Sequence, residues 1–96
     1  MVRHAFLSNF KIEVTQRNRD EFAGAVKTLV QIPGVRNVVV GNALEGGSKA
    51  LYGVAVFTDL DNEAALKGFN DHPMHKAVAA QILPILGEYL VLDYLC

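Results

Sequence analysis

The stretch Ile32-Pro33-Gly34-Val35-Arg36-Asn37-Val38-Val39-Val40-Gly41 ends one kind of secondary structure and begins another. Before it, apolar residues recur at helical spacing at Phe22, Ala25, Val26, Leu29 and Val30. Pro33 and Gly34 are typical of the end of a helix, because proline cannot continue it and glycine accepts the backbone angles that close it. The three valines that follow favour a strand. The chain is therefore predicted to alternate helices with strands.

Outward from this stretch, periodicity and turn residues predict the remaining elements. Asn18 and Glu21 form a predicted capping pair for the first helix, and Asp61 is the predicted N-cap of the second, with Glu63 in its first turn. The expected elements besides that first helix are strands over 2–14, 35–41, 50–60 and 88–95, a loop over 42–49, and a helix in two pieces from 61 to 72 and 73 to 83.

This order of strand, helix, strand, strand, helix and strand is that of the ferredoxin-like split βαβ arrangement, an α+β fold. Right-handed crossovers then predict a four-stranded antiparallel sheet in the order 4-1-3-2, with the helices on one face. Alternation makes both faces largely apolar. The face carrying Leu7, Ala55, Phe57 and Leu92 has no helix to cover it. We therefore expect a homodimer, since an exposed apolar sheet marks an interface.

The stretch Asn70-Asp71-His72-Pro73-Met74-His75 places a histidine in the first turn of a predicted helix, because proline is well tolerated at the first helical position. His75 heads an apolar stripe made of Val78, Ala79, Ile82 and Leu83. It is therefore predicted to face the core, either as a structural histidine bonded to backbone or to Asp93, or as an acid–base group. His72 is expected to cap the helix or to face solvent.

Two opposing effects act on His75 in this interpretation. A helix N-terminus favours the neutral imidazole and a nearby carboxylate favours the charged form, so the ring is predicted to titrate near neutral pH. Such a group suits removal of a proton from carbon beside a carbonyl. Strand pairing predicts that Asp93 meets His4, either as a structural pair or as a group that orients the chemistry. No cysteine supports a metal site at the histidines, so no metal is expected.

Composition limits the kinds of binding partner and the cellular compartment that we expect for this protein. The 96 residues are interpreted as a single domain, 1–96, with 51% hydrophobic residues and a net charge of −1. No basic stripe appears, so nucleic acid and anionic membranes are poor partners. Cys96, the only cysteine, excludes a disulfide within the chain and favours a cytoplasmic setting. No segment is predicted to span a membrane.

The chain resembles the stress-responsive dimeric α/β-barrel (Dabb) family along essentially its whole length. The segments that carry the resemblance are Arg3-His4, Ile32-Pro33-Gly34-Val35, Asp61 to Leu66, His72-Pro73-Met74-His75 and Tyr89-Leu90-Val91-Leu92-Asp93-Tyr94. The resemblance implies a homodimer whose two sheets pack into one barrel. The family includes olivetolic acid cyclase, in which a histidine matching His75 is the base. The assisting tyrosine of that cyclase falls on Phe69 here, and a further pocket histidine falls on Val54.

The resemblance also implies a ligand cavity between the helices and the sheet. Its expected lining, beside the catalytic candidates His75, Asp93 and His4, is Phe6, Phe22, Val54, Val56, Phe69 and Val91. Two functions follow as alternatives. The protein is a cofactor-free proton-transfer enzyme, cyclase-like or isomerase-like, with His75 as base; or it is a ligand-binding or stress-associated dimeric protein without turnover. In both, the ligand is an apolar small molecule.

Overall fold

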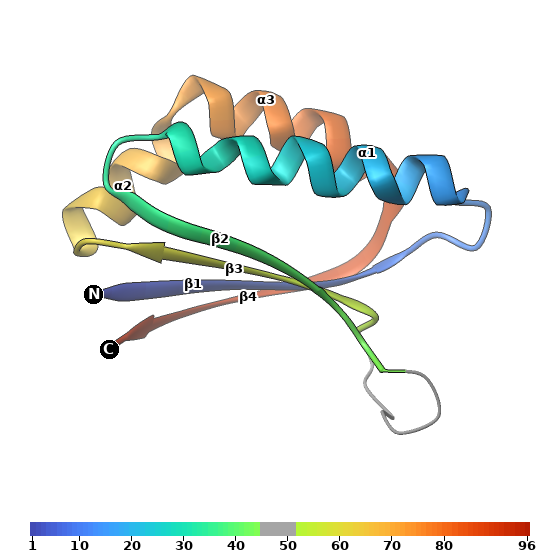
Figure 1. Cartoon of the computed structure of the whole chain (residues 1–96), viewed down its shortest axis with the longest axis horizontal. Coiled ribbons are helices and arrows are strands. Elements are labelled where there is room, and N and C mark those ends of the chain that lie inside the picture. The colour runs from blue at the N-terminus through green and yellow to red at the C-terminus, as the bar shows by residue number, and fades with distance from the viewer. Residues whose placement is uncertain (45–51) are drawn as a thin grey trace.

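The computed structural model describes residues 1–44 and 52–96 (Figure 1). Its elements are β1 (Val2–Phe10), α1 (Gln16–Lys27), β2 (Val35–Asn42), β3 (Val54–Leu60), α2 (Glu63–Asp71), α3 (Pro73–Ile82) and β4 (Leu86–Leu95), with short 3-10 turns η1 (Thr28–Gln31) and η2 (Leu83–Ile85). The predicted order of strands and helices is confirmed. Most of the predicted loop over 42–49 and the first two residues of the predicted third strand lie outside the described residues.

The four strands form one antiparallel sheet in the order β2-β3-β1-β4, which matches the expected order read from the other edge. All three helices lie over one face of this sheet, and the opposite face is bare of helices (Figure 1). The central strand β1 pairs with β3 on one side and β4 on the other. His4 consequently lies between Thr58 and Asp93.

Both predicted helix caps are wrong, the first by three residues and the second by one. Thr15 caps α1: its hydroxyl accepts from Asn18 N at 3.1 Å, while the Asn18 side chain accepts from Thr15 N at 3.2 Å. Asn62 caps α2, accepting from Ala65 N at 2.9 Å, and the neighbouring Asp61 instead pairs with Arg36 at 2.5 Å. Several side chains near each helix start can act as caps, so the path of the chain decides which one does.

The ends of two strands also differ from the prediction. β1 stops at Phe10, because a register shift between Ser8 and Phe10 turns the chain out of the sheet and Lys11 N bonds Ile85 O at 3.0 Å. β4 begins at Leu86, two residues earlier than expected. Residues 11–14 continue the alternating pattern in the sequence, but they have no neighbouring strand to pair with and so form no strand.

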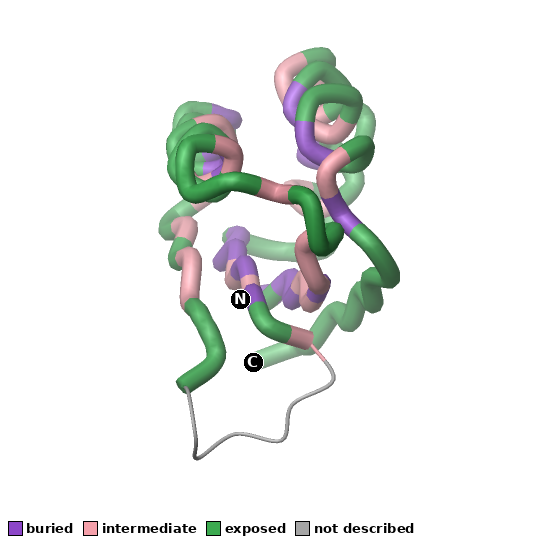
Figure 2. Tube along the Cα trace, turned by 90° about the vertical axis from the view of Figure 1, so that its right-hand side faces the viewer, coloured by how far each residue is buried: buried purple, intermediate pink, exposed green. Residues whose placement is uncertain are grey.

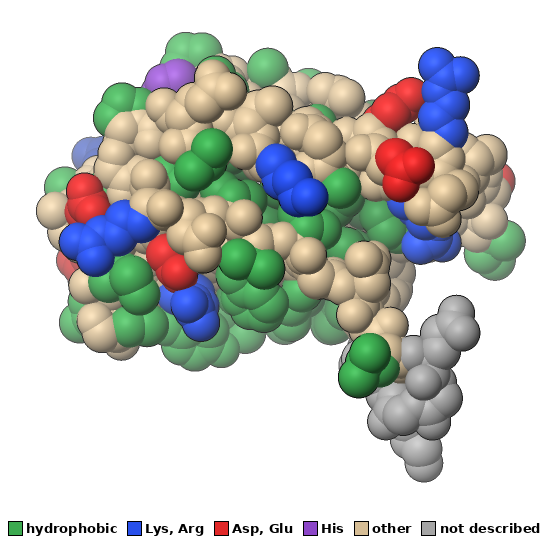
Figure 3. Space-filling view, in the orientation of Figure 1, with side chains coloured by type: hydrophobic (Ala, Val, Ile, Leu, Met, Phe, Trp, Pro, Cys, Tyr) green, Lys and Arg blue, Asp and Glu red, His purple; other side chains and the backbone are tan. Residues whose placement is uncertain are grey.

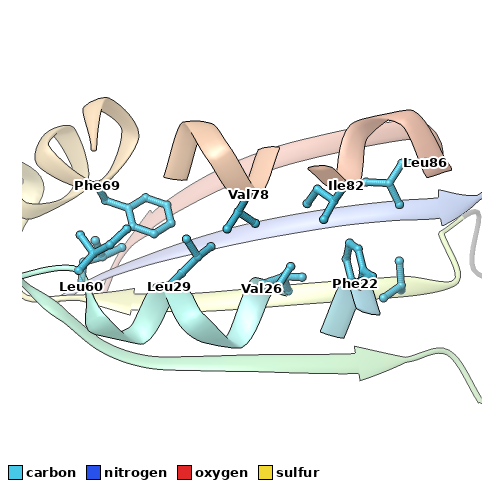
Figure 4. Packing of buried hydrophobic residues seen from close by; sticks show 11 residues of the cluster. Phe22, Val26, Leu29, Leu60, Phe69, Val78, Ile82 and Leu86 are labelled. Atoms are coloured by element: carbon cyan, nitrogen blue, oxygen red, sulfur yellow. The ribbon is translucent and has the colours of Figure 1, made fainter. Parts of the chain in front are cut away.

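The hydrophobic core fills the space between the helices and the sheet, where the buried residues gather in Figure 2. Phe22, Val26 and Leu29 extend from α1 and η1 toward Val78 and Ile82 of α3 (Figure 4). The predicted helical stripes on both segments supply these residues. The core thus holds α1 and α3 at fixed positions over β1 and β3, which positions the histidine at the start of α3.

Gly34 makes the turn between η1 and β2 with a backbone φ of +87°, and a Cβ there would lie 2.6 Å from the Ala65 Cβ. Gly34→Ala should therefore lower the free energy of unfolding by about 1–3 kcal/mol, through a left-handed backbone and overpacking against α2. Urea unfolding checks this. Gly24→Ala in α1, whose Cβ meets nothing within 4 Å, is the control and should be neutral or stabilising. Equal effects of the two changes would contradict this role for Gly34.

Candidate functional site

A cavity of about 290 Å³ lies between α3 and the sheet. Its walls are mostly apolar and come from all the helices and 3-10 turns and from β1, β3 and β4. The expected site residues that line it are His4, Phe6, Val56, Phe69, His75, Val91 and Asp93. The volume is at the small end of the range for ligand-binding pockets. The structure therefore brings all three catalytic candidates to one cavity.

Phe22 and Val54 do not line this cavity. Each is only 2% exposed, and both border a separate, more polar depression beside Phe10 and Arg19. They lie on the predicted face of their elements but toward the other end of them: Val54 begins β3, and Phe22 is one turn before Val26 in α1. Alternation assigns a residue to a face, and it does not assign a position along the strand.

His75 stands in the first turn of α3, half-buried, with its ring 4.6 Å from the Phe69 ring. Burial lowers the pKa of His75 below its usual value of 6.5, and the charge of His4 lowers it further, while the Asn70 backbone opposes this shift. The carboxylate of Asp93 was expected to raise the pKa of His75, but it bonds His4. The imidazole of His75 is thus held in its neutral, proton-accepting form.

His4 and Asp93 form the second part of the site. Asp93 Oδ1 lies 2.5 Å from His4 Nδ1, and the two residues face each other across the β1–β4 pairing. Because a carboxylate only accepts, Nδ1 carries the proton and the ring orientation is set. The His4 ring also meets the edge of Phe69 at 5.6 Å. Phe69 therefore contacts both histidine rings, and within the described parts of the chain no hydrogen bond joins His75 to Asp93.

Three further polar residues line the cavity that the sequence did not single out as site residues. Thr58 is 1% exposed and lies opposite His4, Asn70 is in the last turn of α2, and Tyr89 projects from β4. Strand alternation assigns Thr58 and Tyr89 to the same face of the sheet as His4 and Asp93, so that signal could have found both. Asn70 had no such signal, because its contribution depends on how α2 meets α3.

The third histidine has a structural position. His72 caps α3, its Nδ1 accepting from Met74 N at 3.1 Å. This matches the expectation of a capping role and turns its ring nitrogen toward the backbone. Over residues 1–44 and 52–96, no three side chains of the types that hold metal ions come together, and no helix is long and apolar enough to cross a membrane.

The lowered pKa of His75 predicts how the folded protein responds to acid. The folded state binds the His75 proton less tightly than the unfolded state, so this group's contribution to stability is complete above about pH 6.5 and decreases as pH falls toward the folded pKa. NMR titration of the imidazole protons should give a midpoint for His75 below 6.5. A midpoint at or above that value would contradict the burial of the ring.

Comparisons with known proteins bear on both fold and family. The model of the stress-responsive A/B barrel domain (Dabb) matches residues 2–96. A dimeric ferredoxin-like protein of unknown function from Thermobifida fusca is 31% identical, with a TM-score of 0.85 over 97% of this chain and 88% of that chain. A Dabb family protein from Mesorhizobium loti is 24% identical, with a TM-score of 0.85 over 99% of this chain and 95% of that one.

A hydroxynitrile lyase from Passiflora edulis has the same fold, with 21% identity and a TM-score of 0.87 over 97% of this chain and 90% of that chain. Among curated proteins, none matches this chain by sequence. The family match spans nearly the whole chain and agrees with the observed topology. The chain therefore belongs to the stress-responsive A/B barrel domain (Dabb) family and has a ferredoxin-like α+β fold.

Proposed function

We propose that this protein binds a small apolar carbonyl compound in the cavity beneath α3, and that His75 removes a proton from the carbon next to the carbonyl. The observation that carries the proposal is a half-buried histidine, with a pKa below its usual value, in a mostly apolar cavity that a His4–Asp93 pair also lines. A neutral imidazole in such a place is a proton acceptor at neutral pH. The chemistry needs no cofactor.

The proposed step moves one proton and one electron pair. A ring nitrogen of His75 takes the proton, the carbon–hydrogen bond breaks, and its electrons form the carbon–carbon double bond of an enolate. Negative charge gathers on the carbonyl oxygen. In its protonated form, His4 donates Nδ1–H to Asp93 and keeps Nε2–H for that oxygen. Return of the proton to the same or another atom completes an exchange, an isomerisation or a ring closure.

The alternative is a binding protein that uses the same cavity without turnover. Phe69 supports this alternative, because it replaces the tyrosine that assists the base in the resembling cyclase. The paired His4 and Asp93 support the enzyme, because a binding cavity for an apolar ligand has no need of an oriented histidine–carboxylate pair beside a second histidine. A fold shared with a hydroxynitrile lyase indicates that this architecture can hold an enzyme in another protein.

Proton exchange in deuterium oxide tests the proposal without knowledge of the natural substrate. Benzylacetone, an apolar ketone, is mixed with the protein, and loss of its α-proton signals is followed by NMR. We expect exchange above the buffer rate at neutral pH, with a rate that falls as the pH is lowered below 6.5 through the lowered pKa of His75. Saturable binding with no exchange above buffer would favour the binding protein and reject the base.

We further propose that the protein is a homodimer joined through the sheet face that has no helices. Its apolar residues include Leu90 and Leu92, 41% and 38% exposed, and the half-buried Leu7, Ala55 and Phe57. Hydrophobic side chains gather beneath the sheet in Figure 3. The related Thermobifida fusca protein is described as dimeric.

A charged pair on this face supports its burial. Arg3 binds Asp59 with two hydrogen bonds, of 2.8 Å and 3.1 Å, and Arg3 also lies over the Phe57 ring. This bond holds the pKa of the Asp59 carboxyl below its usual range. A second sheet can therefore cover Arg3 and Asp59 without leaving either charge unpaired, which would otherwise be costly.

A further inference from the structure

An aromatic pair lines the part of the cavity farther from His75 and Asp93. Tyr89 of β4 lines the cavity and stacks on Phe6 of β1, with ring centroids 5.4 Å apart and planes 25° from parallel. Tyr89 is 54% exposed, because β4 is an edge strand, so the cavity reaches the surface beside this ring. Within the described residues its hydroxyl bonds to no other group. The proposed proton-transfer step uses neither ring.

The path of the chain separates Tyr89 from the acid–base groups, and Phe6, which pairs with Val91, lies at the level between them. Tyr89 and Asp93 project from the same face of β4, four residues and thus about 13 Å apart along the strand. α3 runs the opposite way along the cavity, from His75 at one end to Ile82 at the other, about 10 Å later. The cavity consequently has a polar end with His4, His75 and Asp93 and an aromatic end with Phe6 and Tyr89.

Apolar side chains connect the two ends. Val56 and Val91 of the sheet and Val78 of α3 all line the cavity. Such a cavity orients a ligand through the polar group of the ligand and buries the apolar remainder of the ligand against its walls. An aromatic ring at the far end binds more favourably than burial alone would allow, because offset stacking on tyrosine or phenylalanine adds to the binding free energy. A saturated ring does not obtain this contribution.

We infer that Phe6 and Tyr89 form a subsite for a planar ring, so that the ligands of this cavity are ketones carrying an aryl group a short chain away from the carbonyl. The position of the carbonyl end rests on the proposed function, whereas the aromatic subsite rests on the geometry of the Phe6–Tyr89 pair. Tyr89 is thus a specificity-determining residue. The phenyl ring of benzylacetone lies against the pair while its carbonyl faces the histidines.

A matched pair of ketones tests the inference. Dissociation constants for benzylacetone and its cyclohexyl analogue, which differ only in the ring, are measured by NMR titration on the intact protein. The preference is the ratio of these two dissociation constants. Because stacking is lost, Tyr89→Leu should reduce the preference for the phenyl over the cyclohexyl ketone by about two- to tenfold, with little change in the affinity for the cyclohexyl ketone. Tyr89→Phe keeps the ring and should keep the preference. Tyr52→Leu, the same change outside the cavity, is the control.

The outcomes separate this inference from the proposed function. An unchanged preference in Tyr89→Leu, with both ketones bound, overturns the aromatic subsite alone. A preference lost in Tyr89→Leu and kept in Tyr89→Phe supports the subsite even when neither variant exchanges protons, in which case the base is rejected and the subsite stands. Failure of the wild-type protein to bind either ketone rejects both the carbonyl ligand and its aryl group.

Discussion

Replacing His75 with glutamine should slow the exchange of benzylacetone α-protons by about 100- to 10,000-fold, the usual contribution of a general base. Glutamine is polar and of similar size, and it cannot take a proton at neutral pH. Because His75 is only half-buried, the fold should survive the change. The measurement is the exchange rate by NMR, together with thermal unfolding to show that the variant remains folded.

His72→Asn is the matched control for this experiment. It removes the other histidine of the same helix start but keeps a side chain that can cap α3, so both exchange and stability should remain near those of the wild type. Exchange by His75→Gln at the wild-type rate would rule out His75 as the general base. Loss of folding in His75→Gln, with His72→Asn intact, would indicate that His75 is a structural histidine.

Replacing Leu92 with aspartate should dissociate the proposed homodimer. Leu92 lies opposite Ala5 on the sheet face without helices, in the middle of its apolar residues. An unpaired carboxylate buried there on each protomer should weaken association by about 100-fold or more, since an uncompensated buried charge costs about 3–5 kcal/mol. Sedimentation velocity at low micromolar concentration, with circular dichroism to follow folding, measures the effect.

The control for Leu92→Asp is Val30→Asp, which introduces the same charge at a 47% exposed apolar residue of η1, outside the sheet. This variant should sediment as the wild type does. We expect Leu92→Asp to be monomeric, partly unfolded or both, because the apolar face then meets water. A folded wild-type monomer at these concentrations, or a Leu92→Asp dimer as tight as the wild type, would contradict the proposed interface.

Local periodicity was sufficient to predict the fold. Helical spacing from Phe22 to Val30 and from His75 to Leu83 depends only on neighbours in the chain, and so does the run of valines before Gly41. Once the order of elements was known, the handedness of crossovers left one order for the sheet. The pairing of His4 with Asp93 followed in the same way, because antiparallel strands bring the start of one beside the end of the other.

Tertiary structure alone decided the positions along those elements and the partners of the polar groups. Thr15 rather than Asn18 caps α1, because the path of the chain decides which side chain reaches the helix start. Phe22 and Val54 lie beyond the cavity, because spacing assigns a residue to a face and not to a position along its element. The sequence by itself determined that His75 faces inward. Only the packing of α2 and α3 on the sheet decided that the Phe69 ring, and not a carboxylate, lies against the His75 ring. The pKa of His75 is therefore lowered by burial.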